Sequence, residues 1–333
     1  METKQPCLID HYERRLNYLR ISITDRCNLR CLYCMPTGGL EKLEHKDILT
    51  YEEILRLVRI AVRLGVDKIR LTGGEPLVRK DFPHLLPELM TIPGLKDVSI
   101  TTNGIYLKEH LENIRSAGVN RINVSLDSLN RDRYRKITGF DGFERVREGI
   151  QMARALGFDP IKINMVVLKG INDDEVVDFA RLSMREPFHV RFIEYMPSGL
   201  LIHNEPLHYV SNTVLRERLE AIGPLLQLPR KAIDGPTVRY RFEGAEGEIG
   251  FISPLTHHFC QVCNRLRLTA KGHLRPCLLS DQELDLRGPM RAGATDRDLE
   301  NIFAEAADHK PRSHHLDSDD SETLSGRMSA IGG

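Results

Sequence analysis

Three cysteines close together constrain this chain more than any other feature of its sequence. Cys27, Cys31 and Cys34 have the spacing C-x3-C-x2-C within the stretch Cys-Asn-Leu-Arg-Cys-Leu-Tyr-Cys. A structural zinc site or a typical cubane iron-sulfur site takes four protein ligands, and its short spacings are mostly C-x2-C. A 4Fe-4S cluster on three thiolates keeps one iron without a protein ligand, and that iron is reactive. The alternative interpretation is a zinc knuckle, or three unrelated buried thiols.

The other cysteines repeat this grouping. Of seven cysteines in 333 residues, Cys260, Cys263 and Cys277 form a second group of three, which leaves Cys7 as a predicted bystander. In a reducing compartment such grouping is typical of metal ligation and not of disulfides.

Composition indicates an ordinary soluble protein of about two domains. Hydrophobic residues make up 41% and charged residues 28%, and no apolar run approaches the length of a membrane span. The first residues lack a secretion signal, so we expect a cytoplasmic protein without membrane contact. The net charge is zero and there is no Trp, which argues against a nucleic-acid-binding role.

Alternating strand and helix patterns predict a parallel α/β fold. Strands are expected at 19–24, 68–72, 97–101, 121–125, 161–167 and 190–195, with helical segments between them, the first opened by a capping box at Thr50. A closed barrel of this kind has eight strands, so six units predict an incomplete (β/α)6 TIM-like barrel with its site at the carboxyl ends of the strands.

The rest of the chain predicts a small C-terminal domain. We place the barrel domain at residues 1–225 and the C-terminal cluster and substrate-binding domain at 226–307. A linker-like stretch covers 225–240, short strands are expected at 238–242 and 248–252, and a mobile polar tail at 308–333 ends in Gly332-Gly333.

The first cysteine motif, followed one unit later by Gly73-Gly74-Glu75-Pro76, resembles the radical S-adenosylmethionine (SAM) enzymes. The resemblance implies that SAM binds the open iron and is cleaved to a 5'-deoxyadenosyl radical. It also implies cofactor contacts at Tyr33, Gly74, Ser125 and Met196.

The second cysteine group has the spacing C-x2-C-x13-C and continues into Asn264-Arg265-Leu266-Arg267. A hairpin centred near Lys271 would bring Cys277 back toward Cys263. Zinc stays possible on spacing alone, with His257, His258 or His273 as a fourth ligand.

Together, the two cysteine groups, C-x2-C-N-R-L-R and the terminal Gly-Gly resemble the GTP 3',8-cyclase family of molybdenum cofactor biosynthesis. The resemblance implies two 4Fe-4S clusters, with the open iron of the second binding the purine of GTP. It implies radical attack of ribose C3' on C8 to give (8S)-3',8-cyclo-7,8-dihydroguanosine 5'-triphosphate. It further implies a reducing electron donor, a downstream cyclic pyranopterin monophosphate synthase and a homodimer. The implied GTP contacts are Arg20, Arg70, Thr101, Lys162, Arg265, Leu266 and Arg267.

Elementary chemistry agrees with a local anion site. Arg20, Arg70 and Lys162 come from different strands of one predicted sheet, and guanidinium and ammonium groups suit phosphates. Strand alternation would turn Arg265 and Arg267 toward the same face as Cys263, where we expect a catalytic electrostatic role. The competing hypotheses are a two-cluster enzyme that modifies a peptide, and a zinc-stabilised scaffold.

Overall fold

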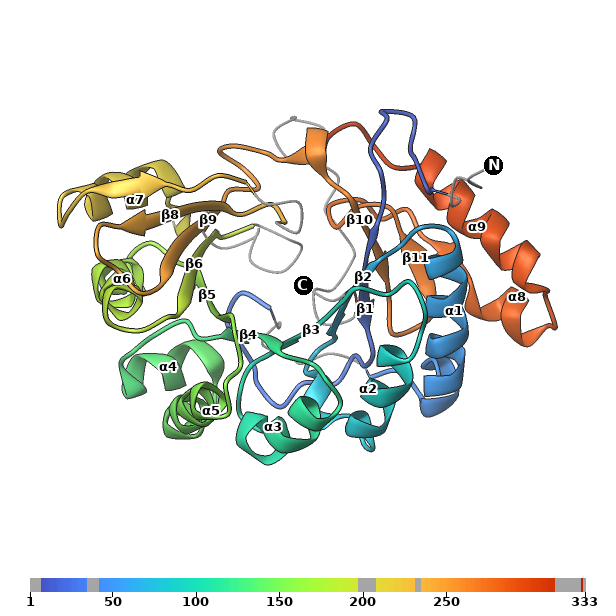
Figure 1. Cartoon of the computed structure of the whole chain (residues 1–333), viewed down its shortest axis with the longest axis horizontal. Helices are drawn as coiled ribbons and strands as arrows, with labels where there is room; N and C mark the ends of the chain where they lie inside the picture. The colour runs from blue at the N-terminus through green and yellow to red at the C-terminus, as the bar shows by residue number, and fades with distance from the viewer. Residues whose placement is uncertain (1–6, 35–41, 197–207, 231–234, 315–330, 332–333) are drawn as a thin grey trace.

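One twelve-stranded sheet organises the molecule. The computed structural model describes residues 7–34, 42–196, 208–230, 235–314 and 331. The strands lie in the order β12-β11-β10-β1-β2-β3-β4-β5-β6-β9-β8-β7, and the sheet curves so that its helices lie on the outside (Figure 1).

The central six strands are parallel and match the predicted barrel units. They are β1 (Tyr18–Ser22), β2 (Lys68–Thr72), β3 (Asp97–Thr102), β4 (Arg121–Ser125), β5 (Ile161–Val167) and β6 (His189–Glu194). The helices that follow them are α1 (Tyr51–Arg63), α2 (Phe82–Met90), α3 (Leu107–Ser116), α4 (Arg131–Thr138), α5 (Phe143–Ala155) and α6 (Val176–Arg185).

The C-terminal part of the chain extends this sheet at both edges. Strand β9 (Glu248–Ile252) pairs in parallel with β6, and β10 (Arg265–Leu268) pairs in parallel with β1. The antiparallel strands beyond them are β8 (Val238–Phe242) and β7 (Leu225–Gln227) at one edge, and β11 (His273–Arg275) and β12 (Leu284–Asp285) at the other. The remaining helices are α7 (Asn212–Glu220), α8 (Arg287–Arg291) and α9 (Asp296–Asp308).

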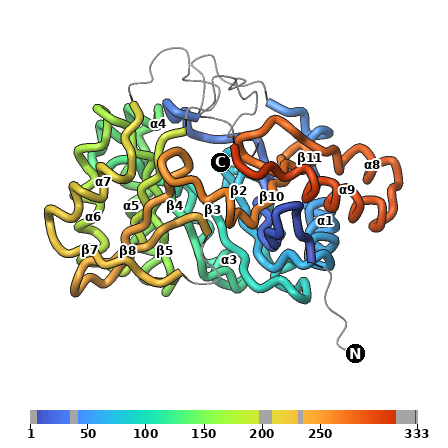
Figure 2. Tube along the Cα trace, turned by 90° about the horizontal axis from the view of Figure 1, so that it is seen from above, coloured from blue at the N-terminus to red at the C-terminus, as the bar shows by residue number. Residues whose placement is uncertain are grey.

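This arrangement confirms the incomplete barrel, because no ladder among the described residues joins β7 to β12. Figure 2 shows β7 and β8 at the opposite end of the molecule from α8 and α9. The stretch 225–240 was predicted as a linker, and the structure differs from that prediction because the stretch begins with a strand, β7. The domain boundaries stay a prediction, and residues 315–330 and 332–333 of the predicted tail lie outside the described residues.

The two faces of the central strands have different chemistry. On β1 the buried side chains of Leu19 and Ile21 alternate with Tyr18, Arg20 and Ser22. Since alternate side chains point to opposite faces of a strand, the apolar set packs under the helices and the polar set faces the barrel interior. The same alternation continues on the neighbouring strands. The fold therefore encloses a polar interior.

Helix α9 holds the C-terminal part against α1. Arg56 Nε lies 2.9 Å from Asp296 Oδ1, and Arg63 Nη2 lies 2.9 Å from Asp296 Oδ2. Both helices carry capping boxes, at Thr50 and Thr295. Among the described helices, none is long and apolar enough to cross a membrane.

The capping box at Thr50 gives a first prediction. Thr50 Oγ1 accepts a hydrogen bond from Glu53 N, and the Glu53 carboxylate accepts one from Thr50 N. Thr50→Ala should lower the free energy of unfolding in urea by about 1 kcal/mol, because the first turn of α1 loses this partner. Thr50→Ser keeps the hydroxyl and should retain the stability; an equal loss in both variants would contradict the capping role.

Candidate functional site

The barrel interior holds a cavity in two adjoining parts, one beside each cysteine group. One part is lined by Cys27, Cys31 and Cys34, and the other by Cys260, Cys263 and Cys277. Six residues line both parts: Arg20, Arg70, Arg191, Ile193, Met196 and Ile252. The structure thus brings together groups that are far apart in the sequence.

The first cysteine group lies on the loop after β1, at the carboxyl ends of the strands. Leu29 N donates to Cys27 Sγ at 3.4 Å, and Cys34 N donates to Cys31 O at 3.0 Å. Burial raises the pKa of all three thiols, that of Cys34 to about 12. Since thiolates are the ligands of iron, a cluster bound here displaces protons as it binds. Three grouped soft donors with no carboxylate among them fit an iron-sulfur cluster.

A hydrogen bond from within the cysteine loop ties it to the barrel. Tyr33 Oη donates to Asp127 Oδ2 at 2.7 Å, and Asp127 Oδ1 accepts from Val166 N at 2.8 Å. Burial raises the pKa of Asp127 to about 6 against the effect of these two donors. The carboxylate therefore joins the cluster loop to β4 and β5.

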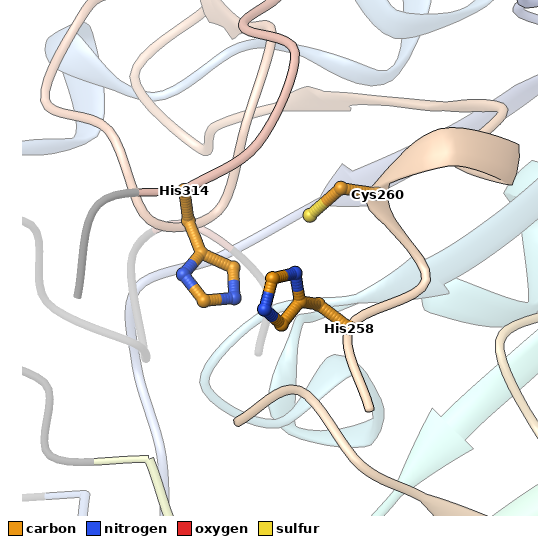
Figure 3. A group of neighbouring side chains, drawn as sticks. All are labelled: His258, Cys260 and His314. Carbon is orange, nitrogen blue, oxygen red and sulfur yellow. The ribbon is translucent and has the colours of Figure 1, made fainter. Parts of the chain in front are cut away.

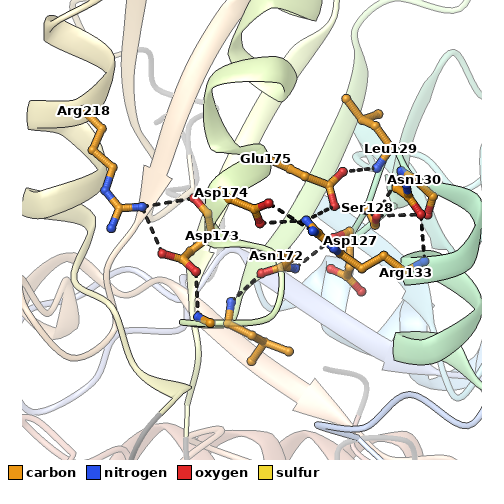
Figure 4. Close-up of polar contacts among 12 residues, drawn as sticks. Asp127, Ser128, Leu129, Asn130, Arg133, Asn172, Asp173, Asp174, Glu175 and Arg218 are labelled. Atoms are coloured by element: carbon orange, nitrogen blue, oxygen red, sulfur yellow. Dashed lines mark hydrogen bonds and ion pairs between the residues drawn. The ribbon is translucent and has the colours of Figure 1, made fainter.

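A polar network behind Asp127 supports this position (Figure 4). Asn172 Nδ2 donates to Asp127 O at 2.8 Å and to Val166 O at 3.0 Å. Glu175 accepts from Ser128 Oγ at 2.7 Å and from Arg133 Nη1 at 2.6 Å. Because its groups are paired, the loop after β4 is held in one geometry.

The Gly-Gly-Glu-Pro loop after β2 contacts the cysteine loop through its backbone. Gly74 N donates to Thr24 O at 2.8 Å, and a Cβ at Gly74 would lie 2.4 Å from Arg26 O. Only glycine permits that approach. The buried carboxylate of Glu75, whose pKa burial raises to about 7, accepts from Leu77 N, Thr102 Oγ1 and Asn103 N.

The predicted cofactor residues surround the same part of the cavity. Tyr33, Gly74, Ser125 and Met196 all line it, together with Thr101. The Thr101 hydroxyl and Asn164 Oδ1 are buried in this wall without a hydrogen-bond partner among the residues that the structure describes. Buried polar atoms of this kind indicate a missing polar ligand, which fits SAM or the substrate. Their specific contacts stay a prediction, and Pro197 after Met196 lies outside the described residues.

The second cysteine group is carried by the segment before β10 and the residue pair after β11. Leu279 N donates to Cys277 Sγ at 3.4 Å. Burial alone would raise the pKa of Cys263, but the charges of Arg265 and Lys310 outweigh it and lower the pKa to about 6. Burial raises the pKa of Cys260, so within this group it is Cys263 that favours the thiolate, the form that binds a cluster.

Two histidines lie beside Cys260 (Figure 3). His258, Cys260 and His314 bring their ligand atoms within 4.8 Å of one another, and His314 Nε2 lies 2.7 Å from Pro254 O. Of the histidines considered for zinc, His257 and His258 are both exposed, but only His258 belongs to this group, and His273 Nδ1 instead lies 2.8 Å from Glu283 Oε2. His258 is therefore the one of the three that the structure places in a metal-binding arrangement.

Between the cysteine groups the cavity is strongly cationic. The strand register places Arg20 opposite Arg70 on one side and opposite Arg267 on the other. Among the described lining residues of the half near Cys260 there is no carboxylate, and the cations are Arg20, Lys68, Arg70, Lys162, Arg191, Arg265, Arg267 and Lys310. A chamber of this composition suits a polyanion.

The alternation predicted for the segment after Cys263 is observed. Arg265 and Arg267 line the cavity, whereas Leu266 and Leu268 are fully buried on the opposite face of β10. Leu266 could therefore reach a ligand only through its backbone, so its contact stays a prediction.

Three lining cations were not anticipated from the sequence: Lys68, Arg191 and Lys310. Lys68 and Arg191 share the inward face of their strands with Arg70 and Ile193, so strand parity could have identified both. Lys310 follows a helix and carries no such periodic signal.

Lys162 provides a prediction about this chamber. Burial, and next to it Arg191, lowers the pKa of Lys162 to about 5. Lys162→Met should therefore raise the free energy of unfolding of the ligand-free protein at neutral pH by about 1 to 4 kcal/mol, because the folded protein holds this amine without the proton that it carries when unfolded. Denaturant titration measures this, with Lys136→Met, an exposed lysine on α4, as control.

The difference in the free energy of unfolding between Lys162→Met and the wild type should depend on pH with a defined sign. The folded pKa of Lys162 lies below the unfolded value of about 10.4, so unfolding takes up a proton between these values. Wild-type stability from this group rises with pH across the window, and the gain from Lys162→Met should shrink toward pH ~10. A gain that is absent at neutral pH, or that grows with pH, would contradict the charge cost.

The family model described as the radical SAM superfamily matches residues 21–183, and that described as Molybdenum Cofactor Synthesis C matches residues 188–316. A GTP 3',8-cyclase of Moorella thermoacetica is 49% identical over 324 residues, which cover 97% of this chain and 99% of that protein. A GTP 3',8-cyclase of Syntrophomonas wolfei is 45% identical and covers 98% of this chain and 100% of the relative.

Solved structures agree on the fold alone. The crystal structure of Streptococcus suis SuiB superposes with a TM-score of 0.58 at 15% identity, covering 88% of this chain and 67% of SuiB. The form of SuiB bound to S-adenosylmethionine gives a TM-score of 0.56 at 15% identity over 82% of this chain and 64% of SuiB. The full-length identity to the curated relatives is the stronger finding, and by it this chain belongs to the GTP 3',8-cyclase family.

Proposed function

We propose that this chain converts GTP to (8S)-3',8-cyclo-7,8-dihydroguanosine 5'-triphosphate, the first step of molybdenum cofactor biosynthesis. The enzyme uses two 4Fe-4S clusters and SAM. The observation that carries the proposal is the pair of adjoining cavities, whose walls carry cations between two groups of three cysteines. Neither a peptide substrate nor a zinc scaffold accounts for this arrangement together with the family.

The first half of the cavity is assigned to SAM. Cys27, Cys31 and Cys34 would hold a cluster, which with SAM supplies a 5'-deoxyadenosyl radical. Gly74, Ser125 and Met196 line the adjoining wall and would orient the cofactor. Tyr33 contributes through its bond to Asp127, which fixes the loop that carries the cysteines.

The second half is assigned to GTP. Cys260, Cys263 and Cys277 would hold the second cluster near the purine, and Arg20, Arg70 and Lys162 would bind the triphosphate. Thr101 would reach it from the adjoining wall of the first half. The orphaned hydroxyl of Thr101 would gain a partner when an anion enters, and the buried amine of Lys162, whose pKa burial lowers to about 5, would gain both a proton and a partner. Because the guanidinium groups of Arg265 and Arg267 are fixed in the cavity wall, they would stabilise negative charge without reorganising.

The cellular setting belongs to the same proposal. We infer that the enzyme works in the cytoplasm as a homodimer, receives electrons from a reducing donor and passes its product to a cyclic pyranopterin monophosphate synthase. Size-exclusion chromatography with light scattering tests the dimer.

The first test separates the two cluster sites. After anaerobic reconstitution, the wild type should bind about eight irons per chain, and Cys27→Ser about four. The variant should form no deoxyadenosine from SAM, because the remaining cysteines lie in the other half of the cavity. Wild-type iron near four would refute the two-cluster site, and deoxyadenosine from Cys27→Ser would refute the assignment of the first group to SAM cleavage.

The second test concerns Arg267, which is 4% exposed in the cavity wall. Arg267→Ala should keep both clusters and still cleave SAM, but cyclised nucleotide should fall by about a hundredfold, the usual effect of losing one electrostatic contact to a reacting group. Single-turnover product analysis measures both products in one sample. Arg275→Ala, a buried arginine on β11 that pairs with Glu283, is a matched control for packing damage. Unchanged cyclisation by Arg267→Ala would remove the residue from the reaction.

A further inference from the structure

Lys310 is a buried cation that the proposed reaction does not use. It follows α9 by two residues, is 3% exposed and lines the cavity near the second cysteine group. Its Nζ donates to Arg265 O at 2.8 Å and to Pro276 O at 2.6 Å. These carbonyls belong to residues close to two cluster cysteines, since Arg265 follows Cys263 by two positions and Pro276 precedes Cys277.

The charge of Lys310 has no carboxylate partner in the described part of the chain. Its Nζ bonds to the two carbonyls, which supply dipoles but no net charge. Arg14, which lies on the same side of the site, differs, because its Nε lies 2.6 Å from the buried Asp10 Oδ2. A buried ammonium without a counter-charge is costly, so an anion is expected beside it.

The nearby anions are sulfur ligands. The charges of Cys263 and Cys277 act on Lys310 and oppose the fall in its pKa that burial causes. Three thiolates outweigh the charge of a 4Fe-4S core, so the bound cluster is negative, and one-electron reduction makes it more so. The ammonium has three N–H donors, and the two carbonyls accept from two of them, so a third remains for an anion.

We propose that Lys310 is the counter-charge of the second cluster: a positioning residue that favours its assembly and raises its reduction potential. This rests on the proposed two-cluster function. A fixed cation near a cluster stabilises the reduced, more negative state over the oxidised one. Hydrogen bonds and charge near the ligands are established means of tuning such potentials in general.

Lys310 and Arg14 together link the second cysteine group to the segment that follows α9. Arg14 Nη1 donates to Cys260 O at 2.6 Å, and its Nη2 donates to Pro311 O at 2.7 Å. Together with Lys310, these contacts fasten residues 310–312 directly to the cluster loops. Loss of the cluster should therefore loosen this segment, and loss of the Lys310 contacts should weaken the cluster.

The experiment compares three variants in the full chain. Lys310→Met removes charge and donors, Lys310→Gln removes the charge but keeps an amide donor, and Lys310→Arg keeps the charge. Lys271→Met, an exposed lysine in the β10–β11 turn, is the matched control. Each is placed in a chain whose Cys27, Cys31 and Cys34 are serine, so that every iron signal comes from the second site.

Three measurements distinguish charge from packing. We expect the midpoint potential from EPR-monitored reduction to fall in Lys310→Met and Lys310→Gln, and to stay near the wild type in Lys310→Arg and Lys271→Met. Iron retained after a chelator challenge should also fall in Lys310→Met and Lys310→Gln, and stay near the wild type in Lys310→Arg and Lys271→Met. Amide exchange over residues 309–314 should accelerate about tenfold in Lys310→Met, as expected from the loss of two buried hydrogen bonds.

The outcomes separate this inference from the function on which it rests. If the background chain with intact Lys310 binds no iron, the second-cluster assignment itself fails. If it binds iron but Lys310→Met and Lys310→Gln leave the potential unchanged, Lys310 is not the counter-charge, whatever happens to amide exchange. An equal fall in Lys310→Arg would assign the effect to side-chain shape and also overturn the proposal.

Discussion

The pairing of β1 with both β2 and β10 is the constraint on which the rest of the site depends. It sets Arg267, Arg20 and Arg70 side by side in one row on the inner face of the sheet. Three guanidinium groups in a buried row repel one another, and burial together with this repulsion lowers the pKa of Arg20 and of Arg267. The backbone ladders, and the apolar residues between the arginines on the opposite face, hold the row in place without an anion. An anion that enters finds its binding groups already arranged.

Much of this fold could be predicted because its elements carry local signals. The bounds of β2, β4 and β5 agree with the pattern of apolar residues and turn residues, and the capping box at Thr50 opens α1 as expected. The pairing of β10 with β1 could not be predicted, because the two strands are separated by most of the chain and no local pattern specifies a partner. Only the resemblance connected them, through the two cysteine groups.

The site was predictable to the extent that strand parity or a motif marked its residues. Arg265 and Arg267 followed from alternation, and the cysteines from their spacing. Asp127 was visible only as part of a strand end, because its bond to Tyr33 depends on how the cysteine loop folds back over the barrel. Lys310 had no signal at all, since a lysine after a helix is normally a solvated charge. Residues of this last kind are found only when burial and partners are known.

The neutral net charge of the chain hides the strongest electrostatic feature of the molecule. Positive side chains gather inside the barrel, while many arginines of the outer helices are paired with carboxylates, as in Arg131 with Asp141 on the side of α4. Exposed pairs of this kind are screened by solvent and contribute little to stability, so they offset the formal charge without weakening the interior field. In a low-dielectric chamber the charges of these cations act over the whole cavity, from one cysteine group to the other. The net charge therefore indicates only that a polyanion site must be local, and the inward parity of the strands places the cations inside the barrel.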